Sequence, residues 1–222
     1  MIKAPGLSAT SAYVSILIAM VAGIVFRVWT DRPSAILLLY CVLAFSLALV
    51  EIYVVWFARM QTTVIHNLWG LMSLLLMSIY FYYLLRRHQR LVLTISVILI
   101  ISTVGFTLIW SSWNDYASVA RVIENAGLIL LTLLGFYQLF VVEESQDPLG
   151  SPELWILSGM LIYLTGSLFS FLLSDWILSE DQNAIMGMWY VHNFFNLLRY
   201  LLFAIGFWRV AKVQKMNPVA TA

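Results

Sequence analysis

Seven long apolar stretches divide the sequence, and the short connections between them carry the charged and turn-forming residues. Each stretch has about 20 residues or slightly more, the length of helix that crosses a hydrocarbon core ~30 Å thick. Backbone polar groups in that core must pair within their own segment, which favours helices. The sequence therefore predicts an all-α integral membrane protein, with a single domain over residues 1–222 that forms a seven-transmembrane-helix bundle with spans at about 8–28, 33–57, 64–85, 91–110, 118–142, 153–178 and 186–210.

The composition leaves no room for a large aqueous domain. Hydrophobic residues make up 62% of the chain and charged residues 10%, whereas soluble domains have about 25% charged residues. The net charge of +1 comes without a basic stripe, which excludes nucleic acid as a partner. A single cysteine, Cys41, excludes an internal disulfide. Membrane lipid is the predicted surrounding of a multi-pass protein.

The distribution of basic residues predicts the orientation of the bundle. Cytoplasmic loops carry an excess of lysine and arginine, and here the first connection, the third connection and the C-terminal end hold most of them. This pattern predicts an N-terminus outside and a cytoplasmic C-terminus, in a plasma membrane or a bacterial inner membrane. The residues that favour this orientation are Arg27, Arg32, Arg86, Arg87, Arg90, Arg209, Lys212 and Lys215.

The last apolar stretch is unusual because it contains His192, Asn193, Asn196 and Arg199. At ~1.5 Å per residue, Arg199 lies roughly 15 to 20 Å from Met186 at the start of the stretch, near the bilayer midplane. An arginine there costs at least ~2.5 kcal/mol and normally faces protein or water. The spacing i, i+4, i+7 places His192, Asn196 and Arg199 on one helix face. We therefore expect that face to line a polar cavity.

Polar residues of the other stretches fall at a similar depth, and they predict what surrounds Arg199. Its expected counter-charges are Glu51 and Glu124. Arg121, Glu124 and Asn125 share a face at i, i+3, i+4. Either the group is a structural ionic network, or it forms an outward-facing cavity that binds a small ligand or cation. The predicted ligand-binding residues are Glu51, Asn67, Arg121, Glu124, Asn125, Trp189, Asn193, Asn196 and Arg199.

This reading makes the chain a receptor- or sensor-like component. The predicted cytoplasmic connections are too short for a signalling domain, so a signal would pass to a separate protein partner at the cytoplasmic loops. Retinal is not expected as a cofactor, because retinal proteins with seven helices carry a lysine in the middle of the last one. The lysines here are Lys3, Lys212 and Lys215.

A second hypothesis is a metal-dependent intramembrane hydrolase that acts on a lipid. Imidazole and carboxylate ligands suit Zn or another divalent metal, and the candidate metal ligands are Glu51, His66, Glu124 and His192. None of them occurs in an HxxxH or HExxH spacing, and no catalytic nucleophile stands out, so whether the chain is an enzyme stays open.

A third hypothesis is a transporter or a structural subunit of a membrane complex. The sequence has no convincing inverted repeat of the kind that many transporters show. Gly166, Ser170 and Ser174 form a stripe of small residues on the sixth stretch, and Gly159 and Tyr163 extend it on roughly the same face. Such stripes let another helix approach closely, so we expect a tight helix–helix contact there.

Overall fold

The structure is a computed structural model that describes residues 7–58, 62–109, 118–142, 147–172 and 182–216. These residues are almost entirely helical and contain no β-strand. The long helices are α1 (Leu7–Val25), α2 (Arg32–Tyr53), α3 (Thr63–Leu84), α4 (Gln89–Ile109), α5 (Ser118–Tyr137), α6 (Pro152–Leu172) and α8 (Gln182–Met216). Single π-helical turns extend α2 through Val54–Ala58 and α5 through Gln138–Val142, and short 3-10 turns occupy Val28–Thr30, Arg86–His88 and Pro148–Gly150.

Six of these helical segments are long and apolar enough to cross a membrane, which confirms a multi-pass, all-α membrane protein. The described part of α1 qualifies only as a shorter apolar helix over Thr10–Val25. A seventh span and the orientation of the bundle therefore stay predictions. The expected ends near residue 110 and at 173–178 lie outside the described residues.

Local chemistry explains where two of the helices begin. The Asp31 carboxylate caps α2, because it accepts hydrogen bonds from the Ser34 amide at 3.1 Å and from the Ser34 hydroxyl at 2.6 Å. Pro33 occupies the first turn, where its missing N–H costs nothing. At the other end of the chain, α8 has no internal breaker. It starts four residues before the predicted span and continues six residues beyond it.

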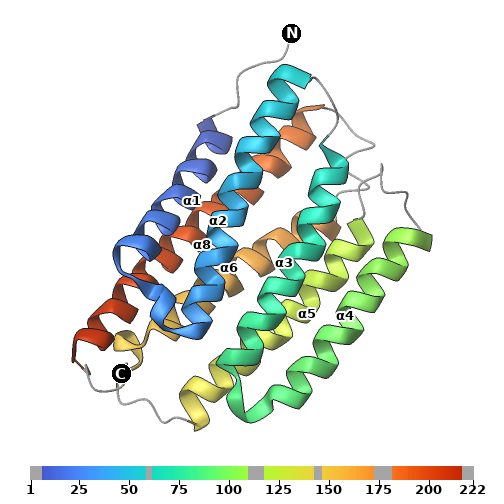
Figure 1. Cartoon of the computed structure of the whole chain (residues 1–222). Helices are drawn as coiled ribbons and strands as arrows, with labels where there is room; N and C mark the ends of the chain where they lie inside the picture. The colour runs from blue at the N-terminus through green and yellow to red at the C-terminus, as the bar shows by residue number, and fades with distance from the viewer. Residues whose placement is uncertain (1–6, 59–61, 110–117, 143–146, 173–181, 217–222) are drawn as a thin grey trace.

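The helices alternate in direction: α1, α3, α5 and α8 run one way and α2, α4 and α6 the other (Figure 1). Contacts between helices follow the chain order from α1 to α6, then join α6 to α8 and α8 to α1. A direct contact between α3 and α5 closes a ring of α1, α2, α3, α5, α6 and α8. Helix α4 packs against α3 and α5 from outside this six-helix ring.

Small residues permit the closest contact of the ring, between α6 and α8. A Cβ added to Gly159 would lie 3.0 Å from the backbone oxygen of Arg199, and one added to Gly166 would overlap the ring of Phe195. The expectation of a tight helix–helix contact along this stripe is confirmed at these two glycines, and Ser174 lies outside the described residues. Their lack of a side chain brings the α8 face that carries Arg199 close to α6.

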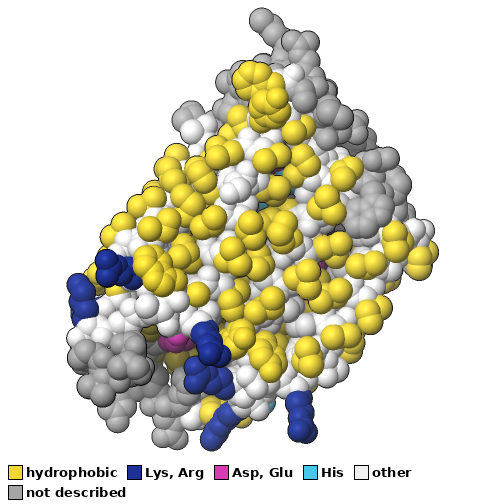
Figure 2. Space-filling view, viewed as in Figure 1, with side chains coloured by type: hydrophobic (Ala, Val, Ile, Leu, Met, Phe, Trp, Pro, Cys, Tyr) yellow, Lys and Arg dark blue, Asp and Glu magenta, His cyan; other side chains and the backbone are white. Residues whose placement is uncertain are grey.

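The surface separates an apolar belt from one charged end. Figure 2 shows hydrophobic side chains over most of the visible face, with lysine and arginine side chains gathered at its lower part. We call this the basic end. Its exposed residues lie where α1, α3 and α8 end and where α2 and α4 begin, namely Arg27, Arg32, Arg86, Arg87, Arg90, Lys212 and Lys215.

Candidate functional site

A cavity of about 560 Å³ lies inside the six-helix ring. All six helices of the ring contribute to its lining, and no residue of α4 does. Most residues expected at the site share this one cavity. The lining includes Glu51, His66, Arg121, Glu124, Asn125, Trp189, His192, Asn193, Asn196 and Arg199, whereas the predicted Asn67 is buried in α3 without lining it.

Arg199 is the most deeply buried arginine of the lining, with only 7% of its surface exposed. Three tyrosine rings surround its guanidinium carbon, at centroid distances of 3.6 Å for Tyr163, 4.6 Å for Tyr200 and 5.5 Å for Tyr40. Its Nη2 donates a hydrogen bond of 2.5 Å to the Asn196 side-chain oxygen. Among the described residues, its Nε has no hydrogen-bond partner. The guanidinium is thus held by cation–π contacts from α2, α6 and α8.

The expected pairing of Arg199 with Glu51 or Glu124 is wrong. Within the described residues no carboxylate lies within 4.0 Å of the Arg199 guanidinium. Glu51 instead meets His66, with 2.7 Å between Oε1 and Nε2. Glu124 accepts a hydrogen bond from Arg121 Nη1 at 2.9 Å and one from Ser73 Oγ at 3.1 Å. Both glutamates are therefore bound by residues other than Arg199, namely His66 for Glu51, and Arg121 and Ser73 for Glu124.

Arg121 crosses from α5 onto α3 and fixes one wall of the cavity. Its Nη1 pairs with Glu124, and its Nη2 donates to the backbone oxygen of His66. The guanidinium lies over Gly70, where an added Cβ would overlap it. A larger residue at position 70 would displace the Arg121 guanidinium, so its contacts with Glu124 and the His66 carbonyl require a glycine there.

Aromatic rings form the wall beside His192. Its imidazole centroid lies 5.5 Å from Tyr163, 5.7 Å from Phe171 and 5.7 Å from Trp189. Trp189 in turn lies 6.5 Å from the ring of His66. The Nδ1 of His192 is buried and has no hydrogen-bond partner among the described residues. It is therefore a buried polar atom whose hydrogen-bonding capacity no described residue uses.

The four candidate metal ligands do not meet at one point. Among the described residues no group of three or more His, Cys, Asp or Glu side chains could hold a metal ion. Glu51 and His66 form one pair, Glu124 is bound by Arg121 and Ser73, and His192 is packed between rings. The set Glu51, His66, Glu124 and His192 is thus divided over separate parts of the cavity.

Sequence reasoning missed the tyrosines around Arg199. Tyr40, Tyr163 and Tyr200 are aromatic residues in apolar stretches, and such residues are common there. Their position in the middle of a span could have indicated a special role, because membrane tyrosines concentrate at the two interfaces. Tyr40 lies eight residues from the first residue of α2, and Tyr200 follows Arg199 directly. Nothing in the sequence indicated the roles of Ser73 beside Glu124 and of Gly70 beside Arg121.

The site therefore combines a ring of six helices, an arginine enclosed by tyrosines and two glutamates with other partners. Asn125 links two neighbouring helices of the ring, because its Nδ2 donates from α5 to Ser167 Oγ on α6 at 3.0 Å. A scan against protein-family models and searches of curated proteins and of solved structures found nothing that matches this chain.

Proposed function

We propose that this multi-pass membrane protein binds a small organic anion in its central cavity, with Arg199 as the anchoring cation. The observation that carries the proposal is a buried guanidinium whose Nε has no hydrogen-bond partner and which has no carboxylate within 4.0 Å among the described residues. An anionic group of the ligand supplies the missing counter-charge. A carboxylate fits best, because the planar guanidinium binds it through two parallel hydrogen bonds.

The contacts of Arg199 within the protein leave one part of its burial cost unmet, the Nε–H without an acceptor. Moving a charge out of water costs several kcal/mol in a protein interior. A cation–π contact returns ~0.5–2 kcal/mol, and one hydrogen bond to a neutral acceptor returns ~1.5–3 kcal/mol when the donor is charged. The three tyrosine rings and Asn196 thus offset much of this cost, while the Nε–H has no hydrogen-bond acceptor among the described residues.

The lining indicates an amphipathic ligand. A volume of about 560 Å³ falls within the ~300–1,000 Å³ of known small-molecule sites. Aromatic and aliphatic side chains from every helix of the ring surround the few polar groups, which suits an apolar or aromatic body that ends in a carboxylate. Examples of these apolar lining residues are Tyr13, Leu47, Trp69, Leu128, Met160 and Phe203.

The proposed role is that of a receptor- or sensor-like component. The connection from α1 to α2 and the one from α3 to α4 are single short turns at the basic end. They hold no domain that could transmit a signal enzymatically, so a ligand-dependent change would pass to a separate protein. With the basic end in the cytoplasm, the end of the cavity near Glu51 and His66 faces the exterior.

Paired compounds test the anion requirement. The full chain in lipid nanodiscs is screened by thermal unfolding against aromatic and aliphatic carboxylates, each beside its neutral amide. We expect carboxylates to raise the melting temperature of the wild-type protein and their amides to leave it unchanged. Arg199→Met should abolish the shift, and Arg90→Gln, at the exposed basic end, should keep it. Equal shifts with acids and amides, or an unchanged response of Arg199→Met, would refute the proposal.

A further inference from the structure

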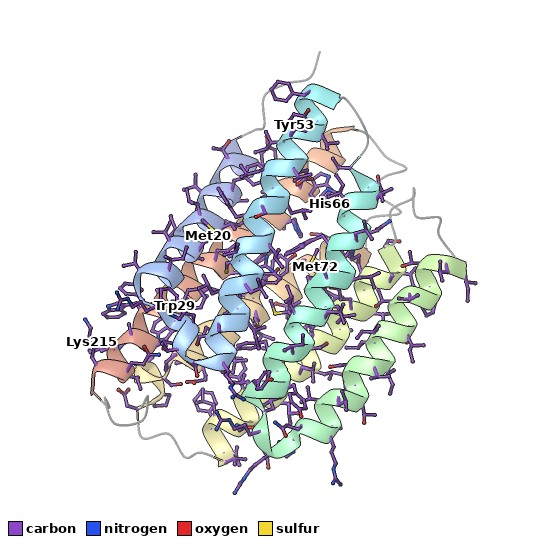
Figure 3. All side chains as sticks on the ribbon, viewed as in Figure 1. Met20, Trp29, Tyr53, His66, Met72 and Lys215 are labelled. Atoms are coloured by element: carbon purple, nitrogen blue, oxygen red, sulfur yellow. The ribbon has the colours of Figure 1, made fainter. Side chains whose placement is uncertain are left out.

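The cavity has a second charged end, formed by Glu51 of α2 beside His66 of α3 and Trp189 of α8. Figure 3 shows His66 and Tyr53 at the end of the bundle opposite Trp29 and Lys215. Glu51 belongs to the last turn of α2, next to Tyr53. The Glu51 side chain is 21% exposed and lines the cavity. A carboxylate thus faces the cavity at the end away from the basic residues.

Two helices give the same separation between this end and Arg199. On α2, Tyr40 contacts the guanidinium, and Glu51 follows eleven residues later, ~16 Å along a helix with ~1.5 Å rise per residue. On α8, Trp189 precedes Arg199 by ten residues, ~15 Å. Helical side chains lean toward the N-terminus of their helix, and α2 and α8 run in opposite directions. The Glu51 and Arg199 side chains are therefore expected to lean toward each other along the cavity.

Between these two ends, the charged groups of the described lining are paired with each other, and Glu51 itself contacts the His66 imidazole. Glu124 is neutralised by Arg121 at 2.9 Å and accepts a hydrogen bond from Ser73. The remaining charged groups are the Arg199 guanidinium at one end and the Glu51 carboxylate at the other. The cavity is thus dipolar, positive at its deep end and negative near His66.

The chemistry at Glu51 suits an ammonium group. One of its oxygens meets His66 Nε2, and a carboxylate has about four acceptor positions, which leaves capacity for a further donor. Trp189, Tyr13 and Tyr190 line the cavity as well. Aromatic faces beside a carboxylate attract an ammonium through cation–π and ionic contacts.

We propose that the ligand is a zwitterion, with its carboxylate on Arg199 and its ammonium on Glu51. The geometry requires the two charges to be separated by a chain of several bonds, as in an ω-amino acid or a dipeptide, rather than carried on one carbon. This inference rests on the proposed function, because it takes the anion site at Arg199 as given and adds a recognition site for the opposite end of the same molecule.

The test compares linear ω-amino acids of four to eight carbon atoms with the carboxylic acids of equal length that lack the amine. Binding to the wild-type chain in nanodiscs is measured by calorimetry. We expect an affinity maximum within the ω-amino acid series, with at least about tenfold tighter binding than the matched acid. This comparison needs no variant. Equal affinity of the two series at every length would overturn the zwitterion proposal and leave the anion site standing.

Two variants assign the ends of the ligand. Glu51→Gln should reduce binding of the best ω-amino acid to the level of its matched acid, without changing the acid itself. Arg199→Met should abolish binding of both compounds, and Glu153→Gln, an acidic residue at the other end of the bundle, serves as the control. Unchanged ω-amino acid binding by Glu51→Gln would overturn the zwitterion assignment. Binding of neither series to the wild type, or full binding by Arg199→Met, would instead refute the anion site.

Discussion

Arg199 determines the electrical balance of the cavity, and its surroundings predict how the ligand-free protein responds to its removal. Removing a buried charge that lacks an ionic partner also removes its desolvation cost and leaves no opposite charge uncompensated. We therefore expect Arg199→Met to keep the free energy of unfolding within ~1 kcal/mol of the wild type. Thermal unfolding without ligand measures this. A carboxylate partner would have made the variant less stable by ~3–5 kcal/mol, and a loss of that size would contradict the structure.

Gly70 gives a sharper prediction because α4 supplies a matched control. A methyl group at position 70 would overlap the Arg121 guanidinium, displacing it from Glu124 and from the His66 carbonyl. Because overpacking costs ~1–3 kcal/mol and an unpaired buried charge adds to it, we expect Gly70→Ala to lower stability by about 2–4 kcal/mol.

The control is Gly105→Ala, since nothing lies within 4 Å of a Cβ at that position. Gly-to-Ala exchange in an open helical position stabilises by up to ~1 kcal/mol. The two variants carry the same chemical change and should shift the melting temperature in opposite directions. Equal shifts would show that Arg121 does not occupy the space over Gly70.

At this scale the sequence was informative about which residues are polar and buried, and silent about their partners. Helical spacing placed Arg121, Glu124 and Asn125 on one face, and all three line the cavity. Spacing within one helix contains no information on which neighbour a face meets. The Arg199 guanidinium therefore contacts tyrosines where carboxylates were expected. Both residue types occur at a similar depth in the bundle, so depth alone did not distinguish them.

Among the helices, the contact between α6 and α8 is the one that positions the site. It depends on Gly166, where a Cβ would overlap the Phe195 ring. We expect Gly166→Ala to separate the two helices locally and to destabilise the protein by about 1–3 kcal/mol, because a packed interface has no space for the extra carbon. Binding of a carboxylate should weaken as well, since Tyr163 of α6 and Arg199 of α8 would move apart.

The comparison for this variant is Gly187→Ala on the same helix as Arg199. No atom lies within 4 Å of a Cβ at Gly187, so stability and binding should stay close to the wild-type values. A Gly166→Ala protein that unfolds and binds like Gly187→Ala would show that the α6–α8 contact tolerates a wider spacing than the structure has.

Helix existence followed from apolar length, because a span of about 20 residues has few other solutions in a bilayer. Helix ends were harder to place. The start of α2 was signalled by Asp31 and Pro33, whereas nothing in the sequence marks the extra residues of α8 at each end. The order in which helices pack was beyond the sequence, because apolar faces toward lipid and toward other helices have the same composition.

The whole molecule has one basic end, and this asymmetry predicts its orientation in the membrane. Variants with one cysteine added to the wild-type chain test it with a membrane-impermeant maleimide on intact cells. Thr63→Cys, at the start of α3, should be labelled from outside, and Arg87→Cys only after permeabilisation. The native Cys41 is fully buried and gives the background. The reverse pattern would place the basic end outside, against the positive-inside rule.

Helix α4 lies outside the six-helix ring, so it belongs to the membrane bundle without lining the cavity. In a closed seven-helix ring, every helix would do both. Because no side chain of α4 reaches the cavity, the exposed positions on its outer face can carry a fluorophore without disturbing the chemistry within, whereas its buried face packs against α3 and α5. A dye for an optical reporter therefore belongs on α4, which is separated from the cavity by α3 and α5 and so cannot block the bound molecule.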